Sequence, residues 1–243
     1  MKVDILTIFP AMVSAYLEES IIKRAIEDQK IDINVVNLRD YSDLSSSQVD
    51  DTPYGGGGGM LLMFPPFYRA IKDLKKENSK VILPSPRGKL YHQGIAKNWA
   101  QEEHLIILAG HYEGIDERVV ELVDEEISLG DYILTGGELA ALIIVDSLTR
   151  LQEGVIKAAS HQNESFEENL LEHPHYTKPQ DYQGYKVPEV LVSGHHEKIR
   201  KWRRYMSLKE TYYKRPDLLK KAKLTKEDEI FLEMIKAKKT LDI

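Results

Sequence analysis

The sequence predicts an α/β fold built on a parallel sheet, followed by a smaller helical domain. Strand-like and helix-like segments alternate up to about residue 151, a pattern typical of parallel sheets covered by helices. One segment, HLIILAG (104–110), is apolar throughout, as expected for a strand buried on both faces. Beyond residue 160 the alternation ends. We therefore expect an α/β domain over 1–160, a flexible linker over 161–172 and a helical domain over 173–243.

The expected strands are short and apolar. VDILTIF (3–9) and DINVVNL (32–38) come first, and both contain β-branched residues. KVILPS (80–85) and HLIILAG follow, and EEISLGDYIL (125–134) is the last.

The expected helices lie between and after these strands. Residues 11–28 have apolar side chains near helical spacing. FYRAIKDLKK (67–76) and a segment near 116–124 are the next two, and GELAALIIVDSLTRL (137–151) is strongly apolar.

The rest of the chain has a different character. ASHQNESFEE (159–168) is polar without an apolar period, and prolines at 174, 179 and 188 interrupt the residues that follow. Helices then dominate to the end, and Thr225 with Asp228 resembles a capping box that begins the last one.

Composition excludes several classes of protein. There is no cysteine, so disulfides, thiolate metal sites and cysteine nucleophiles are excluded. No apolar run approaches the roughly 18–20 residues that span a bilayer, and MKVDILTIFP does not resemble a secretory signal. We expect a cytoplasmic protein with no membrane partner. His195 and His196 are adjacent and would point apart on a helix, so we assign no metal ligands.

Charge is unevenly distributed along the chain. The net charge is −6, yet residues 198–223 carry eleven basic and two acidic residues, a net +9, which leaves −15 for the remainder. Screening limits a charge to a reach of about 8–10 Å, so a basic face on an acidic body still attracts phosphates. A solvated helical face is the alternative that charge alone leaves open.

Three glycine-containing loops follow the three best candidates for parallel strands. They are PSPRG (84–88), AGHYEGIDER (109–118) and LGDYILTGGE (129–138). Ligands of open α/β sheets lie outside the carboxyl ends of the strands, where glycine lets the backbone approach closely. Ordinary tight turns use glycine too, but three such loops after successive strands favour a small-molecule site.

The run of five glycines, 55–59, is not a nucleotide phosphate loop. Met60 and Leu61 follow it in place of Lys and Ser or Thr, and polar VDDTPY precedes it in place of a strand. Ordering each glycine costs roughly 1–2 kcal/mol. The run is therefore either a flexible linker or a loop that folds over a bulky ligand.

Five longer motifs occur in fitting order and spacing. They are DDTPYGGGGGM (50–60), GHYEGIDER (110–118), SLGDYILTGGE (128–138), HPHYTKP (173–179) and SGHHEKIRKWR (193–203). Together they resemble the bacterial tRNA (guanine-N1)-methyltransferase family of the SPOUT superfamily, essentially end to end. The resemblance implies methylation of guanine N1 at position 37 of tRNA. It also implies a homodimer and a deep trefoil knot that holds S-adenosyl-L-methionine, a feature that pattern rules alone do not predict.

The resemblance assigns cofactor contacts to positions on the three glycine loops. These are Ser85, Pro86, Gly110, Tyr112, Glu113, Gly114, Leu129, Gly130, Tyr132, Leu134, Gly136 and Gly137. It assigns tRNA contacts to Asp50, Gly55, Gly56, Gly57, Ser165, Lys198, Arg200 and Arg203. For Trp202, which lies among the basic residues, we expect a place in the core.

The expected general base is Glu164. Guanine N1 carries a proton that must be removed, and the family has an Asp directly before a Ser-Phe pair. This chain has Glu164 before Ser165 and Phe166, an acid that reaches one methylene further. Neighbouring Glu167 and Glu113 stay alternatives.

Arg150 matches a family arginine at the end of the apolar helix. A guanidinium can stabilise the charge that develops on guanine O6, although a helix-terminal cation that complements the dipole is the alternative. The resemblance further implies that the linker orders when tRNA binds and that each site draws on both subunits. It also implies assistance by Mg²⁺. The clustered acids Glu113, Asp116 and Glu117 suit this role, but the sequence does not locate an ion.

Two other functions share part of this pattern. A SPOUT relative with a different target nucleotide would keep the cofactor loops but need not keep DDTPYGGGGGM or Arg150 with an acid near 164. A non-catalytic RNA-binding protein with a decayed pocket would have broken GHYEG and LGDY segments, and both are intact.

Overall fold

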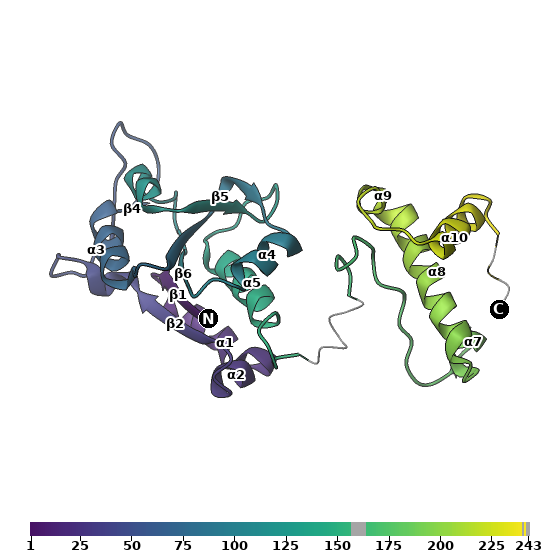
Figure 1. Cartoon of the computed structure of the whole chain (residues 1–243). Helices are drawn as coiled ribbons and strands as arrows, with labels where there is room; N and C mark the ends of the chain where they lie inside the picture. Colours follow the sequence, from purple (N-terminus) through teal and green to yellow (C-terminus); the bar gives the residue numbers. More distant parts are fainter. Residues whose placement is uncertain (157–163, 240, 242–243) are drawn as a thin grey trace. The chain divides into compact units, whose positions relative to one another are not determined.

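The computed structural model describes residues 1–156, 164–239 and 241 (Figure 1). The chain divides into two compact units, Met1–Ile156 and Lys157–Ile243, and each is described by itself. The first part of the predicted linker, 161–163, lies outside the described residues.

A five-stranded parallel sheet forms the centre of the first unit, as predicted. Its strand order is β2-β1-β6-β5-β7. The strands are β1 (Lys2–Thr7), β2 (Asp32–Asn37), β5 (Ser79–Leu90), β6 (His104–Leu108) and β7 (Glu125–Ser128). The prediction of a strand over 125–134 was too long, because β7 ends at Ser128 and Gly130 has a φ of 143°, which strand geometry does not allow.

The helices of the first unit depart from the prediction in three places. The expected helix over 11–28 is two helices, α1 (Pro10–Leu17) and α2 (Ser20–Glu27), because Ser20 has a left-handed φ of 58°. The segment near 116–124 is a short 3₁₀ helix, η2 (Glu117–Leu122). The helix α4 (Gln93–Trp99) was not predicted. The helices α3 (Phe64–Leu74) and α5 (Glu138–Thr149) are confirmed within a few residues.

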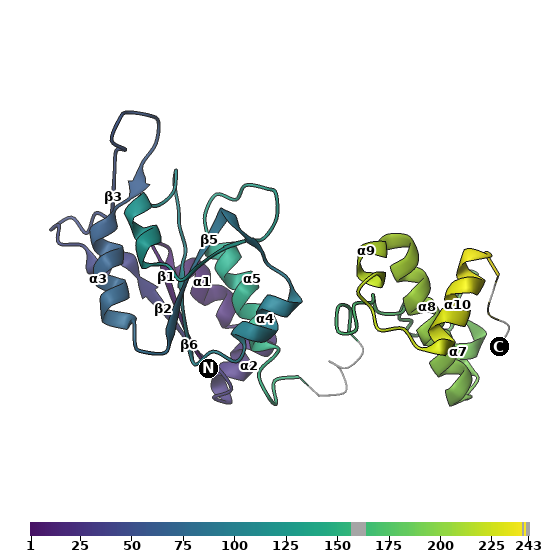
Figure 2. The same ribbon diagram turned by 45° about the horizontal axis from the view of Figure 1, so that its top comes forward.

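Helices cover both faces of this sheet (Figures 1 and 2). Alternate residues of a strand point to opposite faces. Val3 and Ile5 of β1 therefore belong to one core with α1, α2, α4 and α5, whereas Leu6 belongs to a second core with α3 and η2. Both faces of β6 are buried, as its continuous apolar sequence predicts.

The second unit consists mainly of helices around a small core of its own. The helices are α7 (Glu189–Val192), α8 (His196–Lys214), α9 (Pro216–Leu219) and α10 (Lys226–Lys236). A short hairpin of β8 (Asp181–Tyr182) and β9 (Tyr185–Lys186) precedes them. Thr225 and Asp228 form the predicted capping box at the start of α10. No helix among the described residues is long and apolar enough to cross a bilayer.

Residues 164–172, the second part of the predicted linker, pack against α8. Leu170 is buried in the core of the second unit. The Leu171 amide donates to Thr211 Oγ1 over 2.8 Å, and Ser207 Oγ donates to the Leu171 carbonyl over 2.6 Å. This segment therefore belongs to the second unit.

One buried ion pair joins α8 to α10. Arg204 Nε and Nη2 donate to the two Asp228 carboxylate oxygens over 2.7 and 2.8 Å, and the Asp228 side chain is 1% exposed. Burial alone would raise the pKa of Asp228, but hydrogen bonds from Arg204 and Thr225 hold it below its ordinary value. Ionised Asp228 therefore stabilises the folded state.

We expect Asp228→Asn to lower the free energy of unfolding by about 2–4 kcal/mol at pH 7, because it leaves a partly buried guanidinium with only its exposed partner, Glu168. A depressed pKa contributes stability above the unfolded value of about 3.9, and the contribution disappears as pH falls through the folded value. Urea unfolding at pH 7 and pH 3 measures this: the difference between the two proteins should be largest at pH 7 and smaller at pH 3. Asp217→Asn, in an exposed pair with Arg215, is the matched control and should change little. An equal effect of both variants would contradict the account.

Candidate active site

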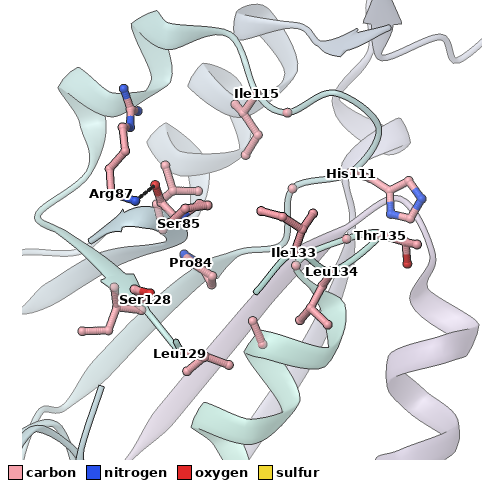
Figure 3. Close-up of a pocket in the computed structure, with 18 of the residues that line it drawn as sticks. Pro84, Ser85, Arg87, His111, Ile115, Ser128, Leu129, Ile133, Leu134 and Thr135 are labelled. Carbon is pink, nitrogen blue, oxygen red and sulfur yellow. Dashed lines mark hydrogen bonds between the residues drawn. The ribbon is translucent and has the colours of Figure 1, made fainter. Parts of the chain in front are cut away.

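One cavity of about 450 Å³ opens at the carboxyl ends of β6 and β7 and beside the middle of β5. The predicted loop 84–88 lies within β5, at a shift of its register with β7 between Pro84 and Lys89. The three glycine loops line it, and Figure 3 shows Ser85, Ile133 and Leu129 around the same hollow. All twelve positions to which the sequence assigns cofactor contacts are among its lining residues. The loops thus meet as expected for parallel strands, whose carboxyl ends lie at one edge of the sheet.

Close backbone contact between two of these loops shapes the cavity. The Gly137 amide donates to the Gly110 carbonyl over 2.6 Å, and His111 forms an antiparallel bridge with Gly136. A Cβ at Gly137 would lie 2.8 Å from the Gly110 nitrogen and 3.0 Å from Ala109 Cα. Only glycine permits this approach, so the sequence fixes how the end of β6 meets the start of α5.

A buried carboxylate beneath this contact was missed by the sequence analysis. Glu138, the first residue of α5, is 1% exposed. It accepts a hydrogen bond from Thr7 Oγ1 over 2.9 Å, and its other oxygen lies 3.4 Å from His111 Nδ1. Glu138 thus links β1 and the 110–114 loop to α5. Its negative charge is favoured at the amino-terminal end of this helix. A lone acid at the start of an apolar helix was the available signal.

We expect Thr7→Val to destabilise the protein by about 1–3 kcal/mol and to weaken cofactor binding, because buried Glu138 loses its donor. Thermal unfolding and cofactor titration measure the two effects. Thr149→Val near the other end of α5 is a matched control, since its hydroxyl bonds only the Val145 carbonyl of the same helix. Unchanged stability of the Thr7 variant would show that the bond to Glu138 contributes nothing.

Two of the acids near the cavity form ion pairs with arginines. Arg118 donates to both carboxylate oxygens of Asp116, and these bonds hold the pKa of Asp116 below its ordinary value. Arg87 Nη1 lies 2.9 Å from Glu117 Oε1. Among the described residues, Glu113, Asp116 and Glu117 do not converge as a ligand set. The Mg²⁺ that the resemblance implies stays a prediction.

The glycine run forms the tip of a hairpin attached to the wall of the cavity. Its strands are β3 (Asp50–Asp51) and β4 (Leu61–Leu62), and its loop projects from the unit (Figures 1 and 2). The Glu113 amide donates to the Met60 carbonyl over 3.1 Å, and the Leu62 amide donates to the Gly114 carbonyl over 3.0 Å. Asp50 and Gly55–Gly57, the predicted tRNA contacts, therefore lie on an arm that is hydrogen-bonded to the 110–114 loop.

Arg150, the proposed catalytic residue of the first unit, does not line this cavity. Arg150 is the C-cap of α5, and twelve residues of helix separate it from Gly137, a length of roughly 18 Å. Glu164 and Ser165 begin the described part of the second unit, where Ser165 Oγ accepts a hydrogen bond from the Glu172 amide over 3.0 Å. Sequence motifs alone did not reveal that Arg150 and the cavity lie at opposite ends of one helix.

The predicted tRNA-binding cations of α8 differ in whether carboxylates bind them. Lys198 and Arg203 are exposed, whereas Arg200 donates to Glu197 and Glu227. Its four hydrogen bonds to these two carboxylates raise the pKa of the Arg200 guanidinium. A phosphate would have to compete with two carboxylates for Arg200, but not for Lys198 or Arg203.

The expectation that Trp202 belongs to the core is wrong. It is half-buried, and its ring centroid lies 6.4 Å from that of His173 and 6.3 Å from that of Tyr176. The core of this unit is built on Tyr205 and Leu208, further along α8.

Comparison with known proteins decides which family shares this arrangement. The tRNA (Guanine-1)-methyltransferase TrmD family matches residues 1–221. The chain belongs to this family. It is 52% identical over 237 residues to a tRNA (guanine-N(1)-)-methyltransferase of Acholeplasma laidlawii, which covers 97% of this chain and 98% of the relative. A relative of the same name from Clostridium botulinum strain Langeland is 54% identical, over 96% of this chain and 98% of its own length. Another, from Spiroplasma kunkelii, is 51% identical, over 99% of this chain and 91% of its own length.

The protein is accordingly a tRNA (guanine-N1)-methyltransferase that uses S-adenosyl-L-methionine. The cavity suits this cofactor in size, since small-molecule sites typically measure about 300–1,000 Å³. Its glycine-lined backbone provides donors and acceptors at close range, as a nucleoside requires. Which residues contact the cofactor stays a prediction.

Proposed function

We propose that this enzyme methylates N1 of the guanine at position 37 of tRNA, next to the anticodon, and that it does so in the cytoplasm. One observation carries the proposal: the twelve predicted cofactor positions surround one cavity, and the arm that bears Asp50 and the glycine run is bonded to its wall. A base presented from a single-stranded loop can enter such a site, because it need not leave a duplex first.

When bound, the cofactor supplies a methyl group that its sulfonium has already activated. The chain's own residues then position and deprotonate the target. The loops containing Ser85, Gly110 and Gly130 would hold the cofactor with their backbone. The trefoil knot that the family resemblance implies is part of this proposal.

In this proposal Glu164 takes the proton from guanine N1. A carboxylate within hydrogen-bonding distance of N1 typically contributes a factor of about 10²–10⁴ to the rate. Removing this proton leaves negative charge on O6, which the Arg150 guanidinium would stabilise. Glu167 and Glu113 are the alternative bases, and Glu113 already lines the cavity.

The position of Arg150 favours an active site shared by two copies of the chain. Arg150 lies at the far end of α5 from the cavity, so it does not reach the cavity of its own chain. In a symmetric homodimer each chain can offer its Arg150 and its Glu164 to the cavity of the other. We therefore propose a homodimer with two composite sites.

We assign tRNA binding to the glycine arm and to α8. Gly55 and Gly56 have left-handed φ values of 85° and 81°, and a Cβ at either would meet nothing within 4 Å, so the arm is shaped by the backbone alone. Lys198, Arg200 and Arg203 of α8 would contact phosphates, and Ser165, which precedes α8 in the chain, is a further predicted tRNA contact. We assign no residues to Mg²⁺ and derive no step through it.

The test is single-turnover methylation of an unmodified tRNA with guanines at positions 36 and 37. We expect N1-methylguanine at position 37, and no product from a tRNA with adenine there. Methylation at another position would contradict the proposed target while leaving the enzyme class unchanged.

A further inference from the structure

Three potential metal ligands converge in the second unit, on a segment that the proposed function does not use. Glu172, His173 and His175 each offer a ligand atom, and these atoms all lie within 4.8 Å of one another. His175 Nε2 is 2.8 Å from Glu172 Oε1, and the two imidazole centroids are 4.5 Å apart. Among the described residues this is the only group of its kind.

Backbone anchors hold this segment in place. The Glu172 amide donates to Ser165 Oγ over 3.0 Å, and the preceding residue, Leu171, is bonded at both its amide and its carbonyl to α8. Pro174 separates the two histidines and fixes one φ between them. The ligands are therefore presented by a constrained backbone, which lowers the entropy cost of bringing them together.

The histidine environment is that of a metal ligand. His173 Nδ1 donates to the Pro174 carbonyl over 3.2 Å, which leaves Nε2 with a free lone pair. Metal-binding histidines commonly make such a bond with the nitrogen that does not bind the metal. Trp202 and Tyr176 pack beside this imidazole cluster and shield one side of it.

We propose that Glu172, His173 and His175 form a Zn²⁺ site with a fourth position left to water. Two imidazoles and one carboxylate are ligands that Zn²⁺ prefers, whereas Mg²⁺ prefers oxygen alone. Ligand atoms of a tetrahedral zinc site, with bonds of about 2.0–2.1 Å, lie about 3.3–3.4 Å apart. The three ligand atoms, all within 4.8 Å of one another, would have to move to this spacing on binding. Arg203 is the cation facing His173, and the Glu172 carboxylate offsets its charge.

Direct binding tests this site. The full chain without an added histidine tag is stripped with a chelator, and ZnCl₂ is titrated by calorimetry. We expect one Zn²⁺ per chain with a dissociation constant in the low micromolar range or tighter, and no competition from Mg²⁺. His175→Gln and Glu172→Gln should each weaken binding by about tenfold or more. His175 is exposed, so its variant should keep the fold, which circular dichroism checks.

His196→Gln is the matched control, since it removes an exposed histidine outside the cluster and should leave zinc binding unchanged. Co²⁺ gives a second readout: the visible absorption of a tetrahedral Co²⁺ site should form with the unaltered chain and be lost in His175→Gln. Failure of the unaltered chain to bind Zn²⁺ stoichiometrically, or binding by both ligand variants as tight as that of the unaltered chain, would overturn the proposal. Glu172 and His175 would then form an ion pair only.

Discussion

Glu164→Gln is expected to slow single-turnover methylation of tRNA by a factor of about 10²–10⁴, the usual contribution of a positioned general base. The substitution keeps the size of the side chain and removes the group that accepts the N1 proton. Cofactor binding should not change, because all twelve predicted cofactor contacts belong to the first unit and Glu164 belongs to the second. Quench-flow measurement at saturating tRNA, with a separate cofactor titration, tests both parts.

Glu167→Gln is the matched control for this experiment, since it removes a carboxylate three residues away. It should retain a rate close to that of the unaltered enzyme. If Glu167→Gln is slow and Glu164→Gln is not, the base is Glu167. If neither is slow, Glu113 becomes the candidate, since it is the remaining alternative and lines the cavity.

Gly137→Ala is expected to weaken cofactor binding by about tenfold or more, because overpacking of a close contact typically costs about 1–3 kcal/mol. The added methyl group meets backbone at Gly110 and Ala109, which cannot rotate away as a side chain can. Two of the three cavity loops must therefore separate. Calorimetric titration with the cofactor measures the loss.

Gly58→Ala is the matched control for this glycine. A Cβ at Gly58 would meet nothing within 4 Å, and Gly58 lies on the projecting arm. Its cofactor affinity should equal that of the unaltered chain. Normal cofactor binding by Gly137→Ala would show that the contact between the loops does not shape the site.

The parallel sheet and the cofactor loops could be predicted from the sequence because local signals encode them. The apolar run of β6 and the glycines after it are adjacent in the chain, and strand direction alone brings the three loops to one edge. Helix ends were predictable where a side chain marks them, as Thr225 does for α10.

The features that could not be predicted depend on backbone conformation or on distant contacts. Nothing in the residue types around Ser20 demands a left-handed φ, so the break between α1 and α2 was hidden. The helix α4 has only seven residues, too few for a clear period. The burial of Glu138 depends on Thr7, which is 131 residues away. Likewise, only the folded unit shows that α5 separates Arg150 from the cavity.

Complementation between two inactive chains tests the composite active site most directly. Gly137→Ala, impaired in the cavity, and Arg150→Ala, impaired in the catalytic cation, are co-expressed with different tags, and the mixed dimer is purified. Each homodimer should have little activity. In the mixed dimer one site combines an intact cavity with the intact Arg150 of the other chain, so roughly half the activity of the unaltered dimer should return. A mixed dimer as inactive as its parents would contradict the shared site and return Arg150 to its own chain.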